Sequence, residues 1–217
     1  MNLERNVREF KKRRNSFHRY ASFDYCFNYF RSFYESDKLD ELASEDNIDR
    51  SCFRLGFYLA SWGMFRGSSF LLGKSAKHFE DLIMTISSMD RKYWEIDVDN
   101  YEKNAESLLT CRDKVRDSIK DQENTPTKKL VTKIMLGVFG NVPALDSNFQ
   151  KGTGFYNKFN KTLLERIRSL YSKHQKEIDG IKIPTIDFVT GDNTNRFYTK
   201  AKIIDMAGFI EGIKKGE

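Results

Sequence analysis

A lone aspartate, Asp146, stands behind Pro143 in the apolar stretch GVFGNVPALDSNF at residues 137–149. Proline has no N–H and holds the residue before it in an extended conformation, so a helix that ends near Gly140 cannot continue through this turn. The chain must cross over and begin again, and Asp146 or Ser147 is a suitable N-cap for the next helix. A carboxylate placed there either satisfies amides at the start of that helix or is held rigidly for chemistry on a ligand.

A second group of residues with chemical potential lies in FRGSS at residues 65–69. Trp62, Arg66 and Ser69 are spaced by three or four residues, so one helical surface could present an aromatic ring, a cation and a hydroxyl. Amides at a helix start together with an arginine form an anion site. A glycine that ends one helix, followed by a serine that caps the next, explains the same residues without a ligand. If these residues line a pocket, we expect Asp146 and Asn148 there too.

Positive charge gathers in two parts of the chain, whose net charge is +6. Residues 1–20 form a basic N-terminal segment in which Glu9 is the one acid of stretch 5–20, and a second basic region lies between residues 128 and 161. Basic clusters near aromatic residues are typical of proteins that bind a phosphate backbone, although solvated helix faces also carry them. The residues that we expect to contact nucleic acid, DNA in the first place, are Arg13, Arg14, Lys128, Lys133 and Lys151.

The composition indicates a globular chain without a membrane partner. The 217 residues suit one domain, and 18 Phe and 10 Tyr supply apolar area for a core. Apolar runs fall short of the roughly 18 residues of a membrane span, and the N-terminus shows no signal-peptide core. Three widely spaced cysteines predict reduced thiols, hence a cytoplasmic location, and no metal-ligand spacing. We expect no cofactor.

Helical periodicity runs through nearly the whole sequence. It predicts an all-α fold, a single-domain bundle over residues 1–217 with seven or eight helices in one lobe or two. Pro184 turns the strand-like stretch 181–190 into an extended connection. The helix over 49–67, apolar on almost every side, is expected at the centre of the bundle. The predicted helices cover residues 22–36, 49–67, 75–89, 99–123, 127–140, 158–178 and 195–213.

The region 125–150 resembles the helix-hairpin-helix DNA glycosylases. The resemblance rests on a lysine near a helix start, an apolar run that ends in Phe-Gly, a short crossing, and an aspartate followed by a small residue, an Asn and an apolar residue. The matching residues are Lys129, Phe139, Gly140, Asp146, Ser147, Asn148 and Phe149. It implies a base-excision activity in which Asp146 stabilises a cationic sugar and Lys129 is the candidate amine nucleophile. The chain departs from the family where ENTPT replaces the Gly-rich hairpin and where iron–sulfur cysteines are absent.

A second resemblance joins FYLASWGMFRGSSFLL and TKIMLGVFGNVPALDSNF to an uncharacterised helical family of bacterial and mobile-element proteins. That resemblance implies no activity. The leading hypothesis is therefore a nucleic-acid-binding protein with glycosylase-like chemistry at Asp146. The alternative is a non-enzymatic helical module that binds a protein partner, for example a regulator or inhibitor from a mobile element.

Overall fold

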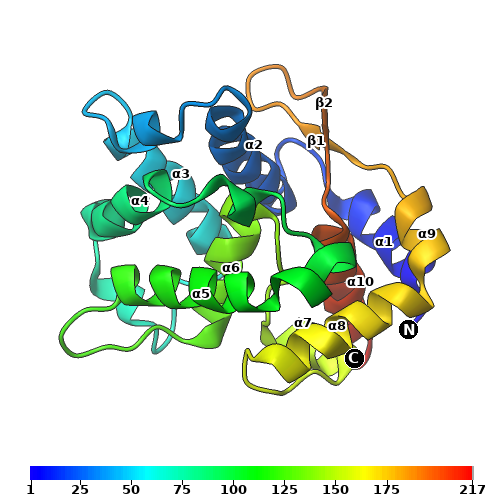
Figure 1. Cartoon of the computed structure of the whole chain (residues 1–217). Coiled ribbons are helices and arrows are strands. Elements are labelled where there is room, and N and C mark those ends of the chain that lie inside the picture. The colour runs from blue at the N-terminus through cyan, green and yellow to red at the C-terminus, as the bar shows by residue number, and fades with distance from the viewer. Residues whose placement is uncertain (217) are drawn as a thin grey trace.

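The computed structural model describes residues 1–216, and helices dominate it (Figure 1). Within these residues the α-helices are α1 (Leu3–Arg13), α2 (Ser22–Glu35), α3 (Ile48–Ser61), α4 (Glu80–Ser87), α5 (Tyr101–Ile119), α6 (Lys128–Phe139), α7 (Ser147–Thr153), α8 (Lys161–Lys173), α9 (Gln175–Gly180) and α10 (Lys200–Lys214). Short 3-10 helices are η1 (Arg19–Ala21), η2 (Leu39–Ala43), η3 (Phe70–Gly73), η4 (Ala76–Phe79), η5 (Arg91–Trp94) and η6 (Val98–Asn100). Two strands, β1 (Pro184–Ile186) and β2 (Asn193–Phe197), complete the described chain.

The expected helical class is confirmed in its coarse form, because the fold is mainly α. It is not purely α, and residues 1–216 contain ten α-helices rather than seven or eight. Two of the predicted helices are divided: 75–89 into η4 and α4, and 158–178 into α8 and α9. No helix in the described part of the chain combines the length and the apolar character needed to cross a membrane.

The centre of the fold is built by α6 and α10, whereas the sequence had favoured the helix at 49–67. Every residue from Leu130 to Phe139 is buried, as is every residue from Ala201 to Ile210. The structural reason is that α3 keeps an outer face, on which Phe53 and Phe57 are exposed. In Figure 1, α6 lies in the middle of the molecule behind α5.

The helix expected over 49–67 ends at Ser61, with Trp62 as its C-cap. Gly63 and Gly67 follow with φ of +74° and +60°, in the left-handed region that favours glycine over other residues. The chain from Gly63 to Ser69 therefore leaves the helix axis and forms a loop. This loop, and not the helical surface expected from the sequence, places Arg66 and Ser69 with Trp62 on the wall of one cavity.

The stretch 181–190 was expected to be a connection, and it instead contains β1. Its partner β2 pairs antiparallel to it, with Pro184 opposite Phe197 and Ile186 opposite Asn193. The prediction failed because the partner strand overlaps the stretch assigned to the last helix. That helix starts only at Lys200, after the N-cap Thr199.

The basic N-terminal segment is part of the packed fold. Leu3, Val7 and Phe10 of α1 are buried, and α1 packs on α10 (Figure 1). The charged residues of α1 remain on its outer side, where Arg8 pairs with Glu4 and Arg13 with Glu9.

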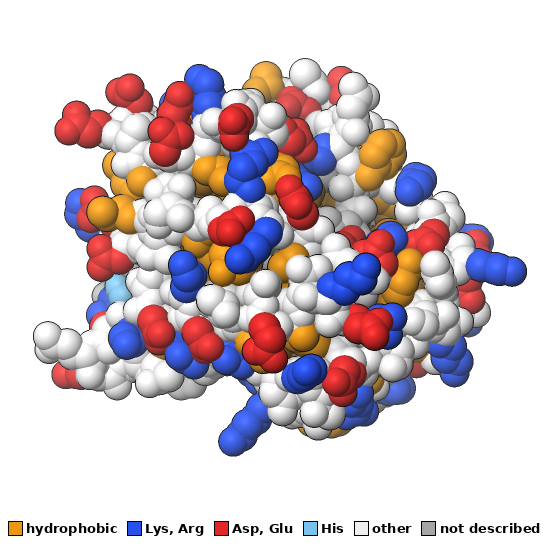
Figure 2. Space-filling model, viewed as in Figure 1, with side chains coloured by type: hydrophobic (Ala, Val, Ile, Leu, Met, Phe, Trp, Pro, Cys, Tyr) orange, Lys and Arg blue, Asp and Glu red, His pale blue; other side chains and the backbone are white. Residues whose placement is uncertain are grey.

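The face of the molecule in Figure 2 mixes acidic and basic side chains, with apolar side chains between them.

Candidate functional site

Asp146 is the N-cap of α7, as the sequence predicts, and it is the end point of a well-anchored crossing. Helix α6 ends at Phe139, and its C-cap Gly140 has a φ of +70° and lies close to the side chains of Phe27 and Thr199. The chain then passes through five buried residues, 141–145, before it reaches Asp146. The carboxylate oxygen Oδ1 accepts a hydrogen bond of 2.9 Å from the amide of Phe149. This bond satisfies one of the free amides at the start of α7.

The crossing is fixed by side chains from three other elements. The amide of Ala144 donates to Asp205 Oδ1 of α10 at 3.0 Å, and the amide of Leu145 donates to Thr132 Oγ1 of α6 at 2.9 Å. The Tyr101 hydroxyl of α5 donates to the carbonyl of Asn141 at 2.6 Å. Buried backbone groups must find such partners. Together these bonds hold the start of α7, and with it Asp146, in one position.

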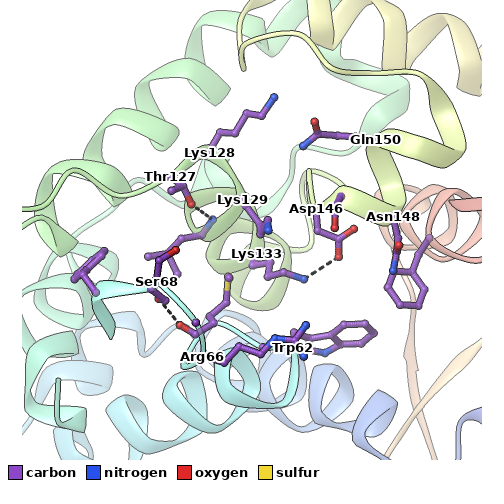
Figure 3. A pocket seen from close by; sticks show the side chains of 18 of the residues that line it. Trp62, Arg66, Ser68, Thr127, Lys128, Lys129, Lys133, Asp146, Asn148 and Gln150 are labelled. Carbon is purple, nitrogen blue, oxygen red and sulfur yellow. Dashed lines mark hydrogen bonds and ion pairs between the residues drawn. The ribbon is translucent and has the colours of Figure 1, made fainter. Parts of the chain in front are cut away.

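The second carboxylate oxygen of Asp146 pairs with a buried lysine. Lys133 Nζ of α6 lies 3.1 Å from Asp146 Oδ2, and the two side chains are 3% and 13% exposed. The ammonium also lies 5.1 Å from the ring centre of Trp62. Figure 3 shows the Lys133 side chain between Trp62 and Asp146, with its nitrogen directed to the carboxylate. One oxygen of Asp146 thus caps a helix while the other faces a cation.

Burial lowers the pKa of Lys133, because desolvation disfavours the ammonium form. The carboxylates of Asp146 and Asp205 oppose this effect, and the nearby ammonium of Lys202 adds to it. Lys202 is itself buried and pairs with Asp205 at 2.8 Å. Groups with perturbed pKa values in a cleft are frequent at functional sites, because catalytic acids, bases and nucleophiles need such tuning.

Asp146 and Lys133 open onto a cavity of about 740 Å³ (Figure 3). Its walls come from the end of α3, the loop after it, the first half of α6, the start of α7 and Phe209 of α10. The predicted site residues that line it are Trp62, Arg66, Ser69, Lys128, Lys129, Lys133, Asp146 and Asn148. The structure therefore brings the expected pocket and the expected catalytic residues into one place.

The cations around this cavity differ in how free they are. Lys128 Nζ donates to the carbonyls of Tyr156 and Asn157, so its charge is tied to the loop after α7. Arg66 and Lys129 form no ion pair or side-chain hydrogen bond with any residue of the described chain. These two side chains are available for an anionic ligand. The Ser69 hydroxyl donates to the carbonyl of Met64 at 2.6 Å and supports the loop.

Three of the predicted nucleic-acid contacts lie outside this cavity. The side chain of Arg14 is only 6% exposed, with its Nε 2.8 Å from Asp24 Oδ2 and its NH2 group 2.6 Å from the carbonyl of Pro184, so it joins α2 to the sheet. Arg13 is exposed on α1 and pairs with Glu9. Lys151 is exposed on α7, beyond the lining residues. The sequence could not separate these roles, since it shows where basic residues occur and not which way they face.

Sequence reasoning missed two features of the site. Lys133 interrupts the apolar run from Leu130 to Leu136, and a charge in a buried helix needs a partner, which was the available signal for its pair with Asp146. Arg19 also lines the cavity, where its NH1 group donates to the carbonyl of Ser61 at 3.2 Å. Nothing in the local sequence distinguishes Arg19 from the other arginines of the N-terminal segment.

The site offers cations, one carboxylate and amides rather than a metal-binding set. Among residues 1–216, no group of three or more His, Cys, Asp or Glu side chains is placed to hold a metal ion. Comparisons of the chain with protein-family models, with curated proteins and with solved structures found no match.

Proposed function

We propose that the protein binds nucleic acid at this cavity and breaks the N-glycosidic bond of one extruded nucleotide, with Asp146 as the catalytic carboxylate. Enzymes that act on a base take the nucleotide out of the stack and hold it in a pocket. A cavity of about 740 Å³ has room for a nucleoside. The unpaired cations of Arg66 and Lys129 on its wall suit the phosphates on either side of that nucleotide.

In this reaction the Asp146 carboxylate faces the sugar and stabilises the positive charge that develops as the C1′–N bond breaks. The electron pair of that bond leaves with the base. A water molecule adds its oxygen at C1′ and gives one proton to Asp146, which passes that proton to the departed base and so returns to the carboxylate form. The rigid crossing before α7 supports this role, because a carboxylate that is already in position needs little reorganisation.

A lyase reaction uses an amine in place of water, and we assign that amine to Lys133 rather than to Lys129. The Lys133 nitrogen is the one that contacts Asp146, at 3.1 Å, and the lowered pKa of Lys133 favours the neutral amine that a nucleophile requires. The nitrogen attacks C1′, the base departs with the bonding electrons, and the proton lost by the amine passes to Asp146. The nitrogen lone pair then displaces O4′ from C1′, O4′ takes the proton held by Asp146, and a protonated imine joins Lys133 to the opened sugar.

The observation that carries the proposal is the Lys133–Asp146 pair on the wall of a cavity that also contains Trp62. Capping of α7 engages Oδ1 only, so Oδ2 remains with a cation that a substrate can replace. A carboxylate that only capped the helix would need neither a place on the cavity wall nor a second contact, the one between its Oδ2 and Lys133.

The test is an assay of base release and strand cleavage on duplex oligonucleotides that each carry one uracil, 8-oxoguanine, alkylated adenine or abasic site. Borohydride should trap the wild-type protein covalently on the cleaved substrate. Asp146→Asn keeps an oxygen for the Phe149 amide and should lose base release while it stays folded by circular dichroism. Lys133→Met should lose the trapped complex, whereas Lys129→Gln should retain it. Absence of release on every substrate, or full activity of Asp146→Asn, would reject the proposal.

A non-enzymatic module that binds a protein partner is the second candidate. The observation that favours it is the mutual satisfaction of Lys133 and Asp146, since buried pairs of this kind also occur as purely structural contacts. In that case Asp146→Asn should reduce stability and change no activity on any nucleic acid. The oligonucleotide assay therefore separates the two candidates.

A further inference from the structure

The outer face of α3 carries an aromatic surface that the cavity at Asp146 does not use. Phe53 and Phe57 are 63% and 67% exposed, and Phe188 from the loop after β1 is 60% exposed. With Tyr25 they line a second cavity of about 510 Å³. Soluble proteins seldom leave several large aromatic side chains exposed in one place unless the surface binds something.

Two arginines accompany these rings. Arg50 and Arg54 line the same cavity, and the Arg54 guanidinium lies 4.8 Å from the ring centre of Phe188. Neither arginine forms an ion pair with a residue in the range 1–216. The one acid in the lining, Asp49, accepts a hydrogen bond from the amide of Arg50. The surface therefore offers flat apolar rings beside cations with unused charge.

From this placement we propose that the outer face of α3 binds a single-stranded nucleic acid, whose bases stack on Phe53, Phe57 and Phe188 and whose phosphates meet Arg50 and Arg54. Proteins that bind single strands combine aromatic platforms with a positively charged track in this way. A duplex fits less well, because its bases are stacked inside and cannot reach the rings.

Two other occupants are disfavoured by the same charges. A second copy of this chain, related by a two-fold axis through the surface, would bring Arg50 and Arg54 close to their own symmetry mates. An apolar peptide would bury both guanidinium groups without supplying an acid, and burial of an unpaired charge is costly. A single-stranded nucleic acid supplies phosphates for the two arginines and exposed bases for the aromatic side chains.

The path of the strand connects this surface to the first cavity, so the inference rests on the proposed function. Helix α3 runs from the aromatic surface to Ser61, whose carbonyl accepts from Arg19, and both Arg19 and Trp62 line the cavity at Asp146. Phe57 and Trp62 are five residues apart, which on a helix corresponds to about 7.5 Å along the axis and about 140° around it. A strand on the aromatic surface would therefore pass around the end of α3, at Ser61, to reach the cavity that Trp62 lines.

The experiment measures fluorescence anisotropy of a labelled oligothymidylate of about 15 nucleotides at low salt, with the full chain. The double variant Phe53→Ala/Phe57→Ala should bind about tenfold or more weakly. The matched control Met84→Ala removes an exposed apolar side chain from α4 and should bind as the wild type does. Arg54→Gln should reduce the slope of log affinity against log salt by about 0.7. Thermal melting checks that each variant is folded.

Equal binding of oligothymidylate by the double variant and the wild type would overturn the inference, as would an equally large loss of affinity for a duplex in the double variant. A wild-type dimer that the double variant converts to a monomer in sedimentation would assign the surface to self-association instead. If single strands bind through α3 and no substrate loses a base, the inference about the outer face of α3 is supported and the proposed function is rejected.

Discussion

Gly212 of α10 lies directly against the backbone of Asn148 in α7, so closely that a Cβ at Gly212 would overlap the carbonyl oxygen of Asn148. A second contact of this kind joins Gly152 to the carbonyl of Gly208. Glycines let the two helices approach at backbone distance. Since Asn148 lines the cavity at Asp146, the packing of α10 sets the position of one wall of the site.

Gly212→Ala adds only one methyl group, but it should strongly destabilise the protein. The added methyl group forces α7 away from α10, and overpacking of this kind costs about 1–3 kcal/mol. Urea denaturation measures the change in the free energy of unfolding. Gly180→Ala is the matched control, because a Cβ there would meet no atom within 4 Å outside its own helix and chain neighbours, and it should be neutral or slightly stabilising. Similar losses in both variants would show that the contact with Asn148 is unimportant.

The Lys133–Asp146 pair should show coupling in a double-mutant cycle. Lys133→Met leaves a largely buried carboxylate without its cation and should cost about 3 kcal/mol of unfolding free energy. Addition of Asp146→Asn to that variant removes the unpaired charge and should recover part of the loss. Chemical denaturation of the two single variants and the double variant gives the coupling energy. Strict additivity would contradict a direct interaction.

Asp97 should make stability depend on pH in the acidic range. Burial raises its pKa to about 6, although the amides of Val98, Lys200 and Ala201 donate to the carboxylate and oppose the shift. The folded state then binds the proton more tightly than the unfolded state, so the contribution of Asp97 to stability rises as pH falls through 6 towards the ordinary value of 3.8.

Between pH 7 and pH 5 this contribution should increase by about 1 kcal/mol. The measurement is the free energy of unfolding at both pH values in wild type and in Asp97→Asn. Subtraction of the two profiles removes the titration of other groups. A difference that stays constant with pH, or that has the opposite sign, would be inconsistent with a raised pKa.

Charge removal at the cavity should weaken nucleic-acid binding more than charge removal elsewhere. Arg66→Gln and Lys129→Gln each remove an unpaired cation from the wall, so each should lower the salt slope of duplex binding by about 0.9 and leave the melting temperature unchanged. Lys151→Gln removes an exposed lysine beyond the cavity and serves as the control. An equal effect of all three variants would point to diffuse surface charge rather than to this site.

The mainly helical fold could be predicted from the sequence because most helices here have an apolar stripe, as at Phe79, Leu82 and Ile86. It misplaced ends wherever tertiary geometry decided them. Gly63 looked like an interior helix residue, and it ends α3 because the chain turns there with positive φ. Strand β2 could not be predicted because Asn193–Phe197 is polar and lacks a strand-like pattern. Pairing with β1 and the contacts of Arg196 with Glu35 and Asn28 stabilise it.

The sequence indicated which residues would lie close together at the site, but it did not indicate which partner each of them contacts. The turn at Pro143 indicated Asp146 as an N-cap, which the structure confirms. The spacing of Trp62 and Arg66 predicted one helical surface, whereas a loop places both on the wall of the cavity. The pairing of Asp146 with Lys133 could not be read from spacing, because the two residues lie on different helices joined by a buried crossing. Arg14 looked as available as Lys129, and only the fold shows that Asp24 engages it.

The two tryptophans of the chain occupy very different surroundings. Trp94 is buried in the core against Phe139, whereas the indole of Trp62 lines the cavity and lies 5.1 Å from one ammonium group and 5.3 Å from another. Light emission from an indole responds to nearby charge and to displaced solvent. The protein therefore contains an intrinsic optical reporter at its cavity, and Trp94→Phe would leave Trp62 as the single tryptophan, whose emission can follow ligand binding at the cavity in unlabelled protein.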